Sequence, residues 1–151
     1  MSMDSHYPTH IAHAIFWKDK EGNHPQPFTV INYSDIRDEK WIPVDEDEEV
    51  KKWCIYYTKA LERKGKFKLT IWPEHCIIGS RGHCVVPVID DALQQWAAYS
   101  KRPVNYIMKG QNCRTEMFSA LVAEVEDPLD SSTSLNHGLL SMLRVADRVI
   151  N

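Results

Sequence analysis

The sequence lacks a long apolar stretch, a signal peptide and a strong charge of either sign. No apolar run approaches the roughly 20 residues that span a bilayer, and residues 1–4 lack the basic and apolar regions of a secretory leader. The formal net charge is −3 over 151 residues, which gives no case for binding nucleic acid or a membrane surface. These absences predict a cytoplasmic protein whose partners are small molecules or other proteins.

Cysteine is also scarce, which excludes two further classes. The chain has four cysteines, too few for a disulfide scaffold of this size, and none of them forms the Cys-x-x-Cys pair of many zinc and redox sites. We therefore expect reduced thiols at Cys54, Cys76, Cys84 and Cys113. The length suits one domain, and 43% hydrophobic with 26% charged residues is an ordinary globular composition.

The N-terminal third has no sustained periodicity. Residues 1–45 are rich in His, Pro, Tyr and Asp, and we interpret them as a long structured loop with short extended pieces such as residues 28–31. A loop of that length inside a compact domain is usually functional. Residues 1–45 are therefore predicted to be a functional loop region in front of a βαβ core over residues 46–151, and the Asp and His residues in this loop make a metal site the candidate function.

The rest of the chain alternates between helical and strand patterns. Acidic residues at 45–49 suit the start of a helix rather than a calcium site, and Gly65 suits its end. The spacing of apolar residues predicts helices over 46–63, 85–100 and 135–146, a short helix near 115–123, and strands over 69–72, 104–108 and from 147 onward. The order predicts an α/β fold with a parallel sheet built by right-handed crossovers.

The predicted sheet is incomplete. Three parallel strands, the last beginning at residue 147, would leave apolar faces uncovered and an edge unpaired. The sequence therefore resembles the middle of a domain, and the open edge predicts association into a homo-oligomer.

One segment places a histidine at the exit of a predicted strand. Pro73 ends the strand over residues 69–72, so His75 follows at its carboxyl end, where open α/β sheets bind ligands. Gly79 and Gly82 let the backbone that follows turn tightly. The alternative is a surface loop with an incidental histidine.

Two other residues share chemistry with His75. Asp4 and His6 are two positions apart, so in an extended chain they project to one face. With His75 they would form a three-ligand site for zinc, iron or manganese with positions open for water or substrate; the alternative is surface polar residues. His10 and His13 suggest a second site by their spacing, but Pro8 argues against a helix there.

Further candidates come from a lysine and from aromatic residues. Lys109 lies at the end of a predicted strand, and Glu116 follows seven positions later. A desolvated lysine beside a carboxylate can polarise a nucleophile. Cys113 is the cysteine with a cationic neighbour in sequence, and the alternatives are an exposed lysine and an inert thiol. The aromatic candidates for a ring-binding pocket, with core packing as the alternative, are Phe16, Trp17 and Trp72.

Three segments together resemble the isochorismatase-like cysteine hydrolases, in particular the nicotinamidase-related amidases. Residues 4–11 are similar to an Asp-x-His-x-x-x-His stretch of that family, and residues 72–82 to its Trp-Pro-x-His-Cys-x-x-Gly-Thr/Ser-x-Gly signature. Residues 109–120 are similar to its Lys-Gly-x-(Asn/Asp)-x-x-x-Glu-x-(Phe/Tyr)-Ser segment. The segments occur in the family's order across nearly the whole chain.

The resemblance implies a three-layer α/β/α fold and hydrolysis of a small amide C–N bond through a cysteine acyl-enzyme. It assigns a divalent metal, zinc first, to Asp4, His6 and His75, and it assigns Lys109 to the catalytic group. A small-molecule amide is the implied substrate.

The departures from the family are at the two ends. Family members carry a catalytic aspartate upstream of the Asp-x-His, and three residues precede Asp4 here. Their nucleophilic cysteine follows the strand that residues 147–150 resemble, and this sequence ends at 151. The expectation is a partial domain over residues 1–151 that is inactive alone. The alternative is a non-catalytic metal- or ligand-binding module, or a subunit completed by another chain.

Overall fold

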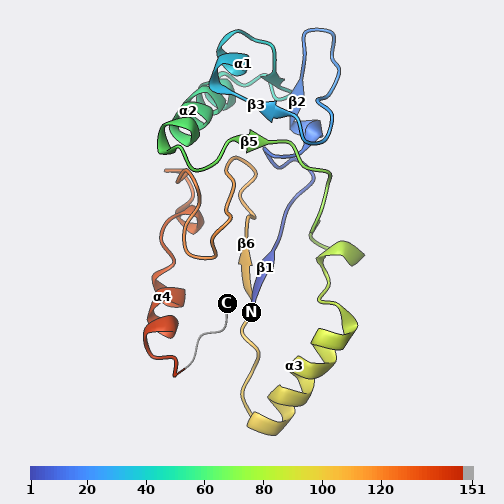
Figure 1. The fold of residues 1–151 in the computed structure, drawn as a ribbon, viewed down its shortest axis with the longest axis vertical. Coiled ribbons are helices and arrows are strands. Elements are labelled where there is room, and N and C mark those ends of the chain that lie inside the picture. The colour runs from blue at the N-terminus through green and yellow to red at the C-terminus, as the bar shows by residue number, and fades with distance from the viewer. Residues whose placement is uncertain (148–151) are drawn as a thin grey trace.

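The computed structural model describes residues 1–147 and shows a mixed α/β chain with small parallel and antiparallel sheets (Figure 1). The helices are α1 (Tyr33–Arg37), α2 (Glu48–Lys64), α3 (Pro87–Ser100) and α4 (His137–Arg144). The strands are β1 (Ser2–Asp4), β2 (Trp17–Lys18), β3 (Val30–Ile31), β4 (Ile42–Pro43), β5 (Leu69–Thr70) and β6 (Ile107–Lys109). Short 3-10 turns occupy Ala14–Phe16, Arg81–His83 and Ser131–Thr133.

The parallel pairing in this structure joins the first and last described strands. β1 pairs with β6 in parallel, and the register places Asp4 opposite Lys109. Past the end of β1 the chain runs alongside the segment that follows β5, with parallel bridges from His6 to Ile77 and from His13 to Trp72. β2–β4 and β3–β5 are antiparallel pairs. The segment after β1 therefore lies between β6 and residues 72–77.

The core lies around α2 and the antiparallel pairs. α2 begins where the Asp47 carboxylate accepts a hydrogen bond from the Glu49 N–H at 2.7 Å, and it ends at Gly65, which has φ 65°. Its inner face buries residues at helical spacing, in the pattern that predicted the helix. The buried core cluster comprises Ile11, Ala12, Trp17, Ile31, Ile36, Cys54, Tyr57, Leu61, Leu69, Ile71 and Val125.

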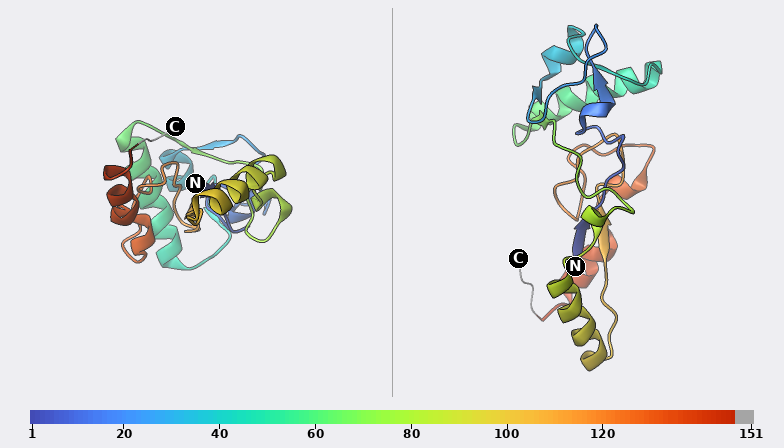
Figure 2. Two further views of the ribbon diagram at one scale, coloured as in Figure 1. Left: turned by 90° about the horizontal axis from the view of Figure 1, so that it is seen from below. Right: turned by 90° about the vertical axis from the view of Figure 1, so that its right-hand side faces the viewer.

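The other half of the molecule is much less packed. α3 and α4 flank the β1–β6 pair on opposite sides, as the ribbon views show (Figures 1 and 2). Neither helix has a buried residue. Most of the apolar burial that holds residues 1–147 together is therefore on the α2 side.

Several predicted elements are confirmed. α2 matches the helix expected over residues 46–63, including its Gly65 cap. α3 and α4 lie within the helices expected over 85–100 and 135–146, although each is shorter.

Other expectations are wrong. The strand predicted at 69–72 pairs antiparallel with β3 instead of joining a parallel sheet with β6. Residues 1–45 hold short extended pieces as expected, with β3 inside residues 28–31, but they also hold α1, which the sequence pattern did not predict because a helix of five residues is too short to show a period. The short helix near 115–123 is absent, and α3 has the predicted helical pattern but no core against it.

The strand predicted from residue 147 onward lies outside the described residues, apart from Asp147 itself. Within residues 1–147, no helix combines the length and the apolar character needed to cross a membrane.

Candidate metal centre

Three ligand atoms converge where β1 ends beside the segment after β5. Nε2 of His6 lies 3.3 Å from Oδ1 of Asp4, and Nε2 of His75 lies 3.8 Å from Oδ2 of the same carboxylate. One ligand atom from each of the three residues lies within 4.8 Å of the others. The structure therefore brings together the three residues that the sequence pattern predicted as metal ligands.

Each of these histidines is oriented by a backbone carbonyl. Nδ1 of His6 lies 2.9 Å from the Gly110 oxygen, and Nδ1 of His75 lies 2.8 Å from the Pro73 oxygen. Because a carbonyl can only accept, Nδ1 donates in both rings, and Nε2 of each ring is the nitrogen that faces Asp4, where a bound ion would take the place of a proton. This is how metal-binding imidazoles are usually fixed.

A glycine at the end of β6 makes room for the His6 ring. Gly110 has φ 77°, and a Cβ at this position would lie 2.7 Å from Cε1 of His6 and 3.2 Å from Oδ1 of Asp4. Both the backbone conformation and the contact distances therefore require glycine here.

Lys109 shares the carboxylate with the triad. Its Nζ donates to Oδ1 of Asp4 at 2.7 Å and to the Met117 carbonyl at 3.0 Å. Burial opposes ionisation of Asp4, but the hydrogen bonds from His6 and Lys109 outweigh it and hold the pKa of Asp4 well below its usual range. Burial also lowers the pKa of His6, yet the contacts with Asp4 and the Gly110 carbonyl raise it overall.

The triad opens into a cavity of about 230 Å³. Glu116 lines it as a nearly buried carboxyl, and burial raises its pKa to about 7. The apolar part of the wall includes the half-exposed Trp72 ring and Phe118. The full lining is Asp4, His6, Trp72, His75, Lys109, Glu116, Met117 and Phe118.

The other two aromatic candidates lie elsewhere. Trp17 is fully buried in the core and donates from Nε1 to the Ile11 carbonyl at 2.7 Å, so its ring packs rather than binds. Phe16 lines a separate cavity of about 560 Å³, and Cys113 faces that same cavity rather than the one around Lys109. Of the three predicted aromatic residues, Trp72 alone adjoins the triad.

Sequence reasoning missed the surroundings of the triad. His10 and His13 are both fully buried beside it, with ring centres 4.4 Å and 5.7 Å from that of His6. Their spacing was the available signal, but the turns that follow β1 bring the rings together without a helix. Met117 and Phe118 line the cavity from the segment near 115–123, which was expected to be a short helix and is not helical.

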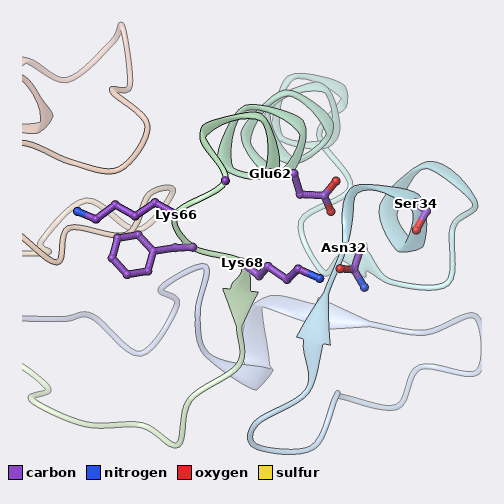
Figure 3. Close-up of a pocket in the computed structure, with 7 residues that line it drawn as sticks. Asn32, Ser34, Glu62, Lys66 and Lys68 are labelled. Atoms are coloured by element: carbon purple, nitrogen blue, oxygen red, sulfur yellow. The ribbon is translucent and has the colours of Figure 1, made fainter.

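A further cavity of about 540 Å³ lies at the end of α2 (Figure 3). Glu62 and Lys68 line it, and the Tyr33 N–H occupies one oxygen of Glu62 at 2.7 Å. The lining shares no residue with the triad: Asn32, Ser34, Glu62, Gly65, Lys66, Phe67 and Lys68.

Comparison with known proteins finds no matching family model, no matching curated protein and no matching solved structure. The function is therefore argued from the geometry of the site.

Proposed function

We propose that this chain binds a divalent transition-metal ion, zinc first, through Asp4, His6 and His75, in a site built for hydrolysis of a small amide. The observation that supports this is the convergence of one carboxylate oxygen and two imidazole nitrogens within 4.8 Å, from segments about 70 residues apart. On this proposal the chain forms part of an isochorismatase-like α/β/α hydrolase domain.

The donor set fits the metal. Two imidazole nitrogens and a carboxylate suit zinc, with iron or manganese as alternatives, and three protein ligands leave a position open. Asp4 is held ionised, which a metal ligand requires. A bound ion would supply Lewis-acid chemistry and a more acidic bound water at the cavity floor.

The chain's own residues contribute charge and shape. Lys109 places an ammonium group, with its side chain 17% exposed, at the edge of the cavity, where it can stabilise a thiolate or a developing oxyanion. Trp72 and Phe118 supply an apolar wall, and the volume of the cavity suits a small substrate.

A cysteine in the lining of the cavity is the element that residues 1–147 do not supply. Burial raises the pKa of Cys54 to about 12, and it also raises the pKa of Cys76 despite the nearby Lys109. Neither thiol is activated. This favours a second candidate function, a metal-binding module that holds the ion without cleaving an amide.

Metal content and ammonia release, measured on the same preparation, test the proposal. We expect one zinc ion per chain in the natural sequence and loss of that ion in His75→Ala, with the exposed His137→Ala as a matched control that retains it. Ammonia released from aromatic and aliphatic primary amides would support the hydrolase. Stoichiometric metal without ammonia would favour the module, and absence of metal binding would overturn both.

A further inference from the structure

Four imidazoles cluster at the candidate metal centre, and the triad accounts for two of them. The His13 ring centre lies 5.7 Å from that of His6 and 5.6 Å from that of His75, with ring planes at 87° and 75°. The His10 ring centre lies 5.5 Å from that of His13. The other two histidines therefore need an explanation.

Hydrogen bonding accounts for His10. Its Nε2 donates to the Thr115 carbonyl at 3.2 Å, and its Nδ1 accepts from the Ala12 N–H at 3.2 Å. Both nitrogens are used, so His10 has no lone pair left for a metal. Its contribution is structural.

His13 differs at one atom. Its Nδ1 donates to the Pro8 carbonyl at 3.0 Å, the arrangement already seen at His6 and His75, so Nε2 carries a lone pair. That Nε2 is buried and has no hydrogen-bond partner among residues 1–147. An unsatisfied buried acceptor costs about 1–3 kcal/mol, and native proteins rarely keep one without a reason.

We propose that His13 is a fourth protein ligand of the ion, an inference that rests on metal binding by the triad. Imidazoles bound to one zinc ion at about 2.0–2.1 Å with tetrahedral angles have ring centres roughly 5 Å apart. The His6, His13 and His75 ring centres are 4.8 to 5.7 Å apart. Nε2 of His13 lies outside the group of atoms within 4.8 Å of one another, so its binding requires the side chains around the ion to rearrange when the ion enters.

A fourth ligand changes what the ion can do. One oxygen and three nitrogens complete a tetrahedral zinc site, and such an ion accepts a substrate oxygen only by expanding to five-coordinate. His13 thus makes the ion harder to remove and limits its access to substrate.

The first test needs no substitution. Zinc-edge X-ray absorption of the zinc-loaded natural sequence should show three imidazoles on the ion. Long-range nitrogen–proton NMR should show Nε2 of His13 shifting with zinc together with Nε2 of His6 and His75. Two imidazoles and an unmoved His13 signal would overturn the inference.

The second test measures zinc affinity by competition with a chromophoric chelator. His13→Gln should weaken zinc binding about 10–100-fold or more, while His10→Gln, whose nitrogens are already engaged, should leave it nearly unchanged. Equal affinity of His13→Gln and the natural sequence would also overturn the inference. If instead the natural sequence does not bind zinc at all, the proposed function fails before His13 is at issue.

Discussion

Asp4 is the residue on which the contacts of the candidate site meet. Its Oδ1 accepts from Lys109 at 2.7 Å and faces Nε2 of His6, and its Oδ2 faces Nε2 of His75. An ammonium group and a divalent ion would share this carboxylate, and two unit charges 4 Å apart interact by about 4 kcal/mol at an effective dielectric constant of about 20. In the metal-free protein Lys109 therefore supplies the positive charge beside Asp4 that a metal ion would otherwise supply.

Lys109→Met should consequently raise zinc affinity, by about tenfold or more, because it removes the competing charge while keeping the length of the side chain. Chelator competition measures the change. Lys18→Met is the matched control, since Lys18 pairs with the exposed Glu46 at 2.9 Å and should not alter zinc binding. Weaker binding in Lys109→Met would show instead that the lysine orients Asp4.

Glu116 predicts a pH-dependent stability. Burial raises its pKa to about 7 from an ordinary 4.5, so the folded state resists its ionisation. Below pH 4.5 the Glu116 carboxyl is neutral in both the folded and the unfolded state, so it does not make stability depend on pH. Between pH 4.5 and about 7 it ionises in the unfolded state before it does so in the folded state, so its destabilisation of the fold grows with pH and is constant above about pH 7. Glu116→Gln should therefore gain stability over the natural sequence across this window, by at most about 3 kcal/mol.

Urea unfolding of the metal-free protein at several pH values measures the difference. Glu126→Gln, at an exposed position, is the control: its free energy of unfolding should differ from that of the natural sequence by the same amount at every pH. If the free energy of unfolding of Glu116→Gln also differs from that of the natural sequence by the same amount at every pH, the raised pKa of Glu116 is contradicted.

At the residue scale the sequence predicts the triad well and its surroundings poorly. Asp4 and His6 share a face because strand periodicity is local, and Pro73 marks the strand exit before His75. The contribution of His13 depends on which carbonyl holds its Nδ1 and on what buries its Nε2. Tertiary contacts of this kind cannot be predicted from the spacing of residues along the sequence.

At the element scale the turn after β6 sets the site. Gly110→Ala should weaken zinc binding at least about tenfold, because the added Cβ would lie 2.7 Å from Cε1 of His6 and displace a ligand. Gly22→Ala is the control: Gly22 has φ 88° but nothing within 4 Å of its Cβ position, so it shares the backbone strain of about 1 kcal/mol without the crowding.

Zinc affinity and the free energy of unfolding, measured on both glycine variants, separate the two effects. Equal zinc affinity in both variants would mean that His6 tolerates the crowding.

The elements that sequence predicts best are those defined by local chemistry. α2 has a capping aspartate, a long apolar period and a terminal glycine, all within one segment. The β3–β5 pairing joins two-residue strands from distant segments, and nothing in either segment specifies its partner. The sequence therefore predicted that residues 69–72 contain a strand, but not which strand it pairs with.

At the scale of the whole molecule, packing divides the chain into a half with a core and a half without one. Helices of this length gain most of their stability from packing, yet α3 buries no residue and leaves Tyr99 92% exposed. We expect this half to gain stability from a partner surface, in keeping with the homo-oligomer that the sequence predicts.

Hydrogen exchange tests that division. Amides of α3 should exchange more than about 100-fold faster than those of α2 around Cys54 and Leu61, because local opening of α3 exposes little new apolar surface. Protection of α3 that rises with protein concentration would identify self-association. Protection equal to that of α2 in a dilute monomer would contradict the division.

Asp4 and His75 lie far apart along the chain. An ion held by both would fasten together points about 70 residues apart, which restricts the unfolded chain as a covalent crosslink does. In a chain whose four cysteines form no disulfide, such an ion would act as a reversible crosslink. Chelation would then loosen the junction between the two halves as well as empty the site.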